Sequence, residues 1–292
     1  MDCLNYINLI FKKEFKINNF AFKKISSIKL ITVLFLIWNT FKLFQIKADP
    51  IIQCLSLLLS IGIFFDIEDK DLYIKNLRRK SFVFGIFLLS ICIFRSFYLI
   101  SVSDKYYYLL LPIGILSISL FGKQDNQFNT FKNIVLLSFL LPLRRLFFYL
   151  FNPILLLLTK YLTFGFLLTL GTNPILEDSS IFFNTTELVI SRGCGGADNM
   201  FFVICSVIIY SVTFRLRKST NLKIIYLTMF LIPLLTNVLR NTLLAAIINL
   251  EVNYKDNLFY FFHDSYGSLI FSFISVLMVS FVYFHLLNKE LD

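Results

Sequence analysis

Three polar side chains of this apolar chain have the types required for thiol chemistry: Cys194, Arg240 and His263. A cysteine thiolate can attack a carbonyl carbon, while an imidazole takes the thiol proton and later returns it to a leaving amine. An arginine can lower the pKa of the thiol or stabilise an oxyanion. Together the three residue types predict cleavage or transfer of a peptide bond, for which these roles suffice without a metal.

Glycines surround Cys194, since Gly193 precedes it and Gly195 and Gly196 follow it. Glycine lets a substrate backbone come close and leaves backbone N–H groups free to face an oxyanion. We also expect Cys194 to begin a helix, whose free N–H groups and positive dipole end would stabilise a thiolate. A buried structural cysteine is the alternative, but a run of glycines packs poorly in a core.

Arg240 and His263 each have a neighbour that could support them. Asn237 lies three residues before Arg240 and therefore shares its helical face. Asp264 follows His263 and could orient the imidazole, although adjacent residues on a helix point about 100° apart. The alternative for Arg240 is an arginine that reaches the lipid head groups, and for His263 a structural residue at the membrane boundary.

The remaining cysteines and the second histidine indicate neither a disulfide framework nor a metal site. The five cysteines are an odd number, and three lie in apolar runs: Cys54, Cys92 and Cys205. On one helix Cys194 and Cys205 would lie about 16 Å apart, too far for a disulfide. His285 is expected at the opposite membrane face from His263, which argues against a histidine-based metal site. We therefore predict no metal and no cofactor.

Composition places the chain among integral membrane proteins. Hydrophobic residues make up 57% of its 292 residues and charged residues 16%, and phenylalanine occurs 36 times. Several apolar runs reach the roughly 20 residues that cross a bilayer core, and in lipid such runs are expected to be helices. The predicted fold class is an all-α polytopic membrane protein with about eight transmembrane helices.

Short polar segments separate the expected spans. The spans cover residues 30–46, 50–66, 81–100, 108–122, 133–150, 194–214, 224–248 and 264–287. The stretch 144–170 is unusual because Arg144 and Arg145 interrupt an apolar run, and an arginine at the bilayer centre costs about 2.5–3.5 kcal/mol on insertion scales. We therefore end the fifth span near Leu143 and expect 144–170 to form an amphipathic helix that lies on the outer surface or re-enters the membrane.

The net charge of +10 indicates membrane orientation and not nucleic-acid binding. With the N-terminus in the cytoplasm, the predicted cytoplasmic segments hold 18 of the 28 lysines and arginines, and the outer loops hold four. The positive-inside rule then makes 1–29 a basic cytoplasmic segment, in which we expect no cleavable signal peptide. A single transmembrane domain follows over 30–287, with its catalytic half over 133–287, and residues 288–292 form a cytoplasmic tail.

This topology brings the three chemical side chains to one side of the cell membrane. Cys194 begins the sixth span, Arg240 lies about 25 Å along the seventh and His263 opens the last, so the active site should face the extracytoplasmic side. The outer loop over 171–193 carries two apolar, β-branched runs on either side of Asn184. This pattern predicts a short hairpin over the same face.

Three motifs in this order resemble the exosortase/archaeosortase family. They are Cys194-Gly195-Gly196, Asn237-Val238-Leu239-Arg240 and His263-Asp264-Ser265-Tyr266-Gly267, within a resemblance that covers roughly residues 80–287. No single motif is specific, but their order, spacing and shared membrane side together are fairly specific. Many members have Cys-Ser-Gly where this chain has Cys-Gly-Gly, which leaves the subfamily open.

The resemblance implies a membrane-embedded cysteine protease or transpeptidase. Its substrates would be membrane-anchored surface proteins with a C-terminal sorting signal: a short motif, a transmembrane helix and a basic tail. Cys194 would be the nucleophile, Arg240 the stabiliser of the thiolate or transition state, and His263 the acid and base. The implied partners are these substrates, the lipid bilayer and an acceptor of unknown chemistry.

Two functions of other classes also fit an apolar chain with a buried arginine. A transporter or permease could use Arg240 to contact an anionic substrate, although the sequence has no inverted repeat. A non-catalytic accessory protein of polysaccharide export is the other alternative. The effect of replacing Cys194 would distinguish these two alternatives from an enzyme, because only an enzyme of this kind requires the thiol.

Overall fold

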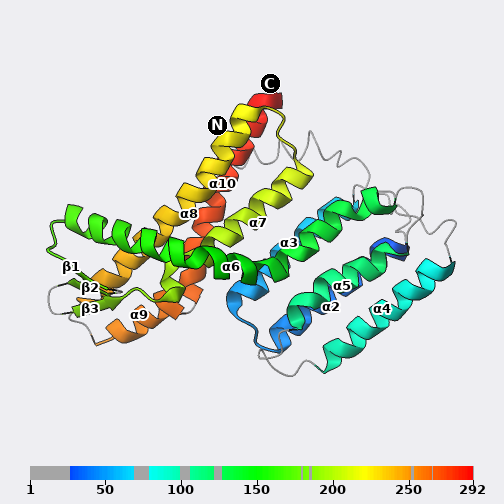
Figure 1. Ribbon diagram of the computed structural model, residues 1–292, viewed down its shortest axis with the longest axis horizontal. Coiled ribbons are helices and arrows are strands. Elements are labelled where there is room, and N and C mark those ends of the chain that lie inside the picture. The colour runs from blue at the N-terminus through cyan, green and yellow to red at the C-terminus, as the bar shows by residue number, and fades with distance from the viewer. Residues whose placement is uncertain are drawn as a thin grey trace.

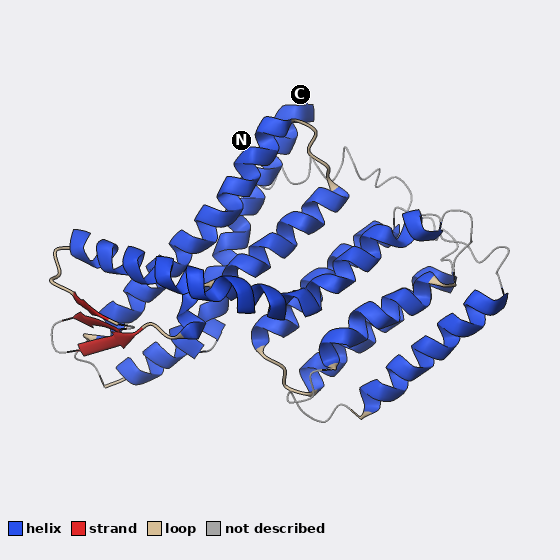
Figure 2. Cartoon of the chain, in the orientation of Figure 1, coloured by secondary structure: helices blue, strands red, loops and turns tan. Residues whose placement is uncertain are grey.

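The computed structural model describes residues 27–68, 79–98, 106–121, 127–178, 180–183, 186–250, 253–264 and 266–291. In these residues the regular secondary structure is helical apart from one small sheet (Figures 1 and 2). The apolar helices are α2 (Ser27–Gln45), α3 (Pro50–Glu68), α4 (Arg79–Phe97), α5 (Tyr107–Ser119), α6 (Gln127–Thr169), α7 (Ala197–Thr213), α8 (Ser219–Ile248) and α10 (Tyr266–Leu291). Most of the predicted basic segment 1–29 lies outside the described residues.

Five of the described helices are long and apolar enough to cross a membrane. These candidate spans are Ile28–Gln45, Pro50–Ile67, Phe131–Thr169, Ser219–Ile248 and Gly267–Leu291. The apolar stretches of α4, α5 and α7 have 17 residues or fewer. The prediction of a helical, multi-pass membrane protein is confirmed, while the number of eight crossings stays a prediction.

The helices form two groups that meet at α3 and α6. In Figure 1, α2, α4 and α5 lie side by side in one group, and α7, α8 and α10 form the other. Leu55, Leu59 and Ile63 of α3 are at most 1% exposed and lie in the core that both groups share. Large side chains on the outward faces, such as Phe94 and Phe281, are 64% and 71% exposed, as expected for contact with lipid.

α6 differs from the prediction for residues 144–170. It is one continuous helix of 43 residues, about 65 Å long, which is twice the thickness of a bilayer core. The fifth span therefore does not end near Leu143. Pro142 and Pro153 lie inside the helix, and prolines bend a helix without necessarily ending it. In Figure 1 the first half of α6 lies along α3, and the second half turns to cross α8.

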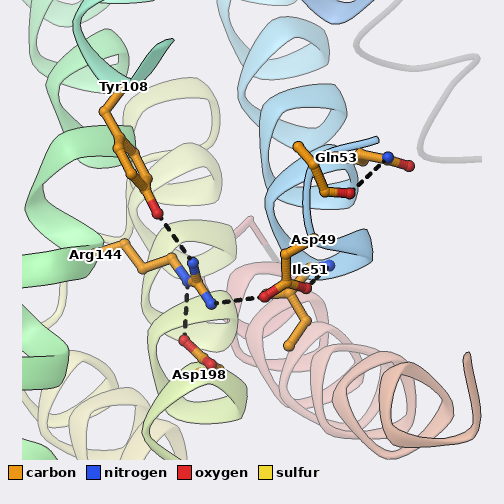
Figure 3. A network of polar contacts seen from close by, with 7 residues as sticks. Asp49, Ile51, Gln53, Tyr108, Arg144 and Asp198 are labelled. Atoms are coloured by element: carbon orange, nitrogen blue, oxygen red, sulfur yellow. Dashed lines mark hydrogen bonds and ion pairs between the residues drawn. The ribbon is translucent and has the colours of Figure 1, made fainter. Parts of the chain in front are cut away.

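Arg144 remains inside the helix bundle because it has acidic partners. Its Nε lies 2.9 Å from Asp198 Oδ1, its Nη2 lies 3.5 Å from Asp49 Oδ2, and its Nη1 donates to Tyr108 Oη at 3.4 Å (Figure 3). Asp49 also accepts a hydrogen bond from the backbone N–H of Ile51 at the start of α3. The desolvation cost that suggested a break at Leu143 is thus offset by ion pairs from two other helix starts.

Replacing Arg144 with methionine is expected to destabilise the protein by about 1–3 kcal/mol, because both carboxylates lose their cation while remaining partly buried. The thermal unfolding midpoint of the purified protein in detergent measures the change. Arg145→Met is the matched control, since the exposed Arg145 contacts only the ring face of Tyr108, at 5.3 Å, among its described contacts. Equal shifts in the two variants would contradict a structural role for the ion pairs.

A three-stranded antiparallel sheet connects α6 to α7. Its strands are β1 (Ile175–Glu177), β2 (Ser180–Phe183) and β3 (Thr186–Val189), in the order β1-β2-β3. The β2–β3 pair, with Ile181 opposite Leu188, forms the predicted hairpin, whereas β1 was not predicted. Ile181 and Leu188 are 0% and 3% exposed and belong to a core cluster that includes Leu244 of α8. We call the end of the bundle that carries this sheet and α9 (Lys255–Asp264) the sheet end.

Candidate active site

Cys194 lies in η1 (Arg192–Gly195), a 3-10 turn between β3 and α7. The helix begins at Ala197, later than predicted, because Gly196 takes a φ of 81°, a left-handed conformation that favours glycine. The thiol therefore belongs to the turn in front of the helix and not to the helix itself. The side chain of Cys194 is 1% exposed, so the turn holds the sulfur inside the protein.

Gly195 and Gly196 allow the turn to pack closely against two helices. A Cβ atom on Gly195 would lie 2.7 Å from Asn152 Oδ1 of α6, and one on Gly196 would lie 2.6 Å from Asn237 Nδ2 of α8. Both distances are too short for a side chain at these positions, so larger residues would displace the turn or its neighbours. The glycines thus have a packing role in addition to any role in approaching a substrate.

Side chains of α6 and α8 hold the turn by its carbonyl groups. Hydrogen bonds reach three successive carbonyl oxygens: Gly193 O from Arg240 Nη2 (3.2 Å), Cys194 O from Asn237 Nδ2 (2.7 Å) and Asn241 Nδ2 (3.1 Å), and Gly195 O from Thr159 Oγ1 (3.2 Å). The four donor residues are all buried, and each bond contributes about 0.5–1.5 kcal/mol, or more for the charged donor. The backbone around Cys194 is therefore fixed from two sides.

His263 approaches the thiol from the last turn of α9. Its Nε2 lies 3.3 Å from Cys194 Sγ, although the two residues are 69 positions apart in the sequence. The imidazole is half-buried and stacks on the ring of Phe259, with 5.1 Å between centroids and 16° between planes. His263 therefore lies on a separate short helix and does not open the last span, which begins with α10 at Tyr266.

Polar neighbours change the acidity of the thiol. Burial by itself raises the pKa of Cys194, but the hydrogen bond with His263 and the positive charges of Arg240 and His263 outweigh burial, so the pKa is lowered from its ordinary value. Ser191 Oγ, 3.7 Å from the sulfur, acts in the same direction. Because cations stabilise the thiolate, the site favours the form of cysteine that acts as a nucleophile.

The structure brings together six of the seven residues that the sequence suggested for the site: Cys194, Arg240, His263, Gly195, Gly196 and Asn237. The seventh, Asp264, is the last residue of α9, and its side chain falls outside the described residues. These residues lie close enough together to act as predicted, and the roles themselves stay predictions.

Two residues that support the turn were not predicted from the sequence. Asn241 follows Asn237 by four residues, and this spacing indicates that the two side chains share a helical face. The sequence could therefore have predicted that Asn241 lies beside Asn237 in the site. Thr159 lies in the apolar stretch of α6 and carried no such signal. Its contact with Gly195 depends on the path of a helix that the sequence analysis had interrupted.

The chemistry of the site is that of a thiol, an imidazole and a guanidinium. Among the described residues, no group of three or more histidine, cysteine, aspartate or glutamate side chains could hold a metal ion. The described cysteines are free: Cys54, Cys92, Cys194 and Cys205. Of these, Cys194 is the one whose sulfur has a histidine nitrogen within hydrogen-bonding distance in the described part of the chain.

Comparison with known proteins gives a match to a protein family. The model of a family described as transmembrane exosortase matches residues 30–280. No curated protein and no solved structure matches the chain. The matched range begins within α2 and ends within α10, and it contains the sheet, η1 and the described residues that contact Cys194.

Proposed function

Because the chain belongs to the transmembrane exosortase family, we propose that it cleaves C-terminal sorting signals of exported surface proteins through an acyl-enzyme on Cys194 and passes the cleaved protein to an acceptor. The observation that carries the proposal is the 3.3 Å contact between Cys194 Sγ and His263 Nε2. Two residues with complementary proton chemistry meet there: Cys194 from a turn that α6 and α8 hold in place, and His263 from α9.

The proposed reaction has two steps. In the first, His263 takes the proton of the Cys194 thiol, the sulfur attacks the carbonyl carbon of the cleaved peptide bond, and a thioester forms. The C–N bond breaks as His263 returns the proton to the leaving amine. In the second, a nucleophile of the acceptor attacks the thioester and restores the thiol. If water takes that place, the outcome is hydrolysis.

Arg240 would stabilise negative charge during these steps. Its guanidinium is buried, donates to Gly193 O and lowers the pKa of the neighbouring thiol. A fixed positive charge in a site from which water is largely excluded acts more strongly than the same charge in water. We assign it to the thiolate before attack and to the oxyanion afterwards.

The sheet end is proposed to face the extracytoplasmic side. Most lysines and arginines lie in segments that this orientation leaves in the cytoplasm, including Arg215, Arg217 and Lys218 between α7 and α8. A substrate with a transmembrane helix and a basic C-terminal tail would insert with this tail in the cytoplasm, by the same positive-inside rule. Its sorting motif would then lie at the depth of Cys194, in the proposed catalytic half over 133–287.

A covalent intermediate on Cys194 is the expected result that tests this function. Mass spectrometry of the protein purified from its native membrane should find a peptide that contains Cys194 joined by a thioester to the C-terminus of a surface protein, and hydroxylamine should release it. Cys205, which is buried in α7 among apolar side chains, serves as the matched cysteine and should carry no adduct. An adduct on both cysteines, or on neither under conditions of active processing, would contradict the proposal.

A further inference from the structure

β3 is an edge strand, because the sheet ends with it in the order β1-β2-β3. One edge of β3 pairs with β2, with Phe183 opposite Thr186 and Ile181 opposite Leu188. Two residues separate β2 from β3, and such a short connection makes the flanking pair, Phe183 and Thr186, a hydrogen-bonded one. Hydrogen-bonded and non-hydrogen-bonded pairs then alternate, so Ile181 and Leu188 are also hydrogen-bonded.

The backbone groups of the intervening residues point to the free edge of β3. These residues are Glu187 and Val189, whose partners across the pair are Phe182 and Ser180. The carbonyl of Val189 accepts a hydrogen bond from the N–H of Ser191. Among the described residues no backbone partner is found for the N–H and C=O of Glu187 or for the N–H of Val189.

The β1–β2 pairing supports the same alternation. Its connection also has two residues, so Glu177 and Ser180 form the hydrogen-bonded pair, and the backbone groups of Leu176 point away from β2. In β2, the backbone groups of Ser180 and Phe182 therefore point to β1, and those of Ile181 and Phe183 point to β3, as expected for a central strand. Among the described residues, the outward backbone groups of Leu176 and Glu187 have no backbone partner, so each outer strand of the sheet has an open edge there.

The free edge of β3 leads directly into the candidate active site. β3 ends at Val189, and the next element along the chain is η1, which contains Cys194. In the view of Figures 1 and 2, α9, the helix that carries His263, lies at the same end of the molecule as β3. Phe259 and Phe262 of α9 pack against the core cluster that contains both Leu188 and Cys194, so α9, β3 and the turn that carries the thiol share one apolar core.

We propose that the substrate segment next to the cleaved bond binds in extended form as a fourth strand along the free edge of β3. This inference rests on the proposed function and adds to it the way the substrate is held. Exposed strand edges are templates for added strands, and main-chain hydrogen bonds provide affinity that depends little on side chains. The order would become β1-β2-β3-substrate, with the cleaved carbonyl at the end of β3 that leads to Cys194.

Removing the outward N–H of Glu187 tests the proposal. Glu187→Pro deletes this donor at an edge position where proline is tolerated, and Glu187→Ala loses the same side chain, including its bond to Ser180 Oγ, but keeps the donor. The probe is the membrane-anchored precursor that accumulates in a Cys194→Ala strain, followed by pulse-chase in cells that carry each variant. We expect cleavage in Glu187→Pro to be about two- to tenfold slower than in Glu187→Ala, as the loss of one net hydrogen bond predicts.

The opposite edge provides the control. Leu176→Pro removes an outward N–H from β1, which lies two strands away from the proposed substrate, and cleavage should equal that in Leu176→Ala, which loses the same side chain from the core but keeps the N–H. Equal cleavage in Glu187→Pro and Glu187→Ala, while cleavage still depends on Cys194, would overturn the added strand and leave the proposed function intact. Loss of the dependence on Cys194 would instead overturn the function.

A binding measurement decides the matter if Glu187→Pro does not accumulate in membranes. Amide hydrogen exchange of the peptide that contains 186–189 should slow in Cys194→Ala protein that carries the uncleaved precursor, relative to Cys194→Ala protein without it. Unchanged exchange in that peptide would overturn the proposal, because an added strand must protect the amides of Glu187 and Val189.

Discussion

Replacing Cys194 with alanine is expected to abolish cleavage, with a rate at least about 10⁴-fold below that of the wild type, because the proposed acyl-enzyme forms on this sulfur. Precursors should remain uncleaved and membrane-anchored, and immunoblots of membrane and surface fractions measure them. The turn should keep its place, since Asn237 and Asn241 hold the backbone carbonyl of residue 194 and not its side chain. Cys194→Ser should be similarly inactive, because the weakly acidic hydroxyl provides far less nucleophile than the thiol.

Cys205→Ala is the matched control for this prediction. Cys205 is 0% exposed, lies just over two turns along α7 and contacts the apolar core, so its replacement should leave cleavage in place and affect stability alone. Normal cleavage in Cys194→Ala would exclude the enzyme. A transporter or an accessory protein of polysaccharide export would then be the better interpretation, because neither requires a thiol at this position.

Replacing Arg240 with alanine is expected to lower kcat by about 10²–10³-fold, the effect of removing one preorganised donor from an oxyanion site. The same change should raise the pKa of Cys194, because the charge of Arg240 contributes to lowering it. The rate of alkylation of Cys194 by iodoacetamide, measured as a function of pH, follows the thiolate. Its midpoint should therefore move to higher pH in Arg240→Ala.

Arg240→Lys separates charge from geometry. Lysine keeps the positive charge but lacks the planar guanidinium that donates to Gly193 O, so the alkylation midpoint should stay near that of the wild type while kcat falls. An alkylation profile unchanged in Arg240→Ala would contradict an electrostatic role for Arg240. Protein abundance in the membrane must be equal across the variants, since the buried bond to Gly193 also contributes to folding.

The class of the protein could be predicted from the sequence with little ambiguity. Apolar content and run length are properties of contiguous segments, and they predicted apolar helices at all eight positions where the structure describes them. The hairpin around residue 184 was also predicted, since β-branched runs on either side of a turn are a local signal. These features depend on neighbours within about 20 residues, which a single sequence contains.

The sequence predicted most of the residues of the candidate site but little of their geometry. Membrane topology alone was enough to bring Cys194, Arg240 and His263 to one depth, because each helix fixes height through its rise per residue. Topology gives no lateral position and no orientation. The 3.3 Å contact between Cys194 and His263, and the bonds from Asn237 and Asn241 to one carbonyl, required the packing of α8 and α9 against η1.

Arg144 shows most clearly where the sequence stops being sufficient. From the sequence alone, the charge of Arg144 was expected to cost free energy in the bilayer and so to end the fifth span. Its partners Asp49 and Asp198 lie 95 positions before it and 54 after it, too far along the chain to be recognised. Only the tertiary structure places Asp49 and Asp198 beside it and lets α6 continue to Thr169. Hydrophobicity along the chain determined which segments are helices in a membrane, whereas contacts between distant segments decided which charges are tolerated and where the thiol meets the imidazole. Such contacts depend on how helices pack, which local pattern does not encode.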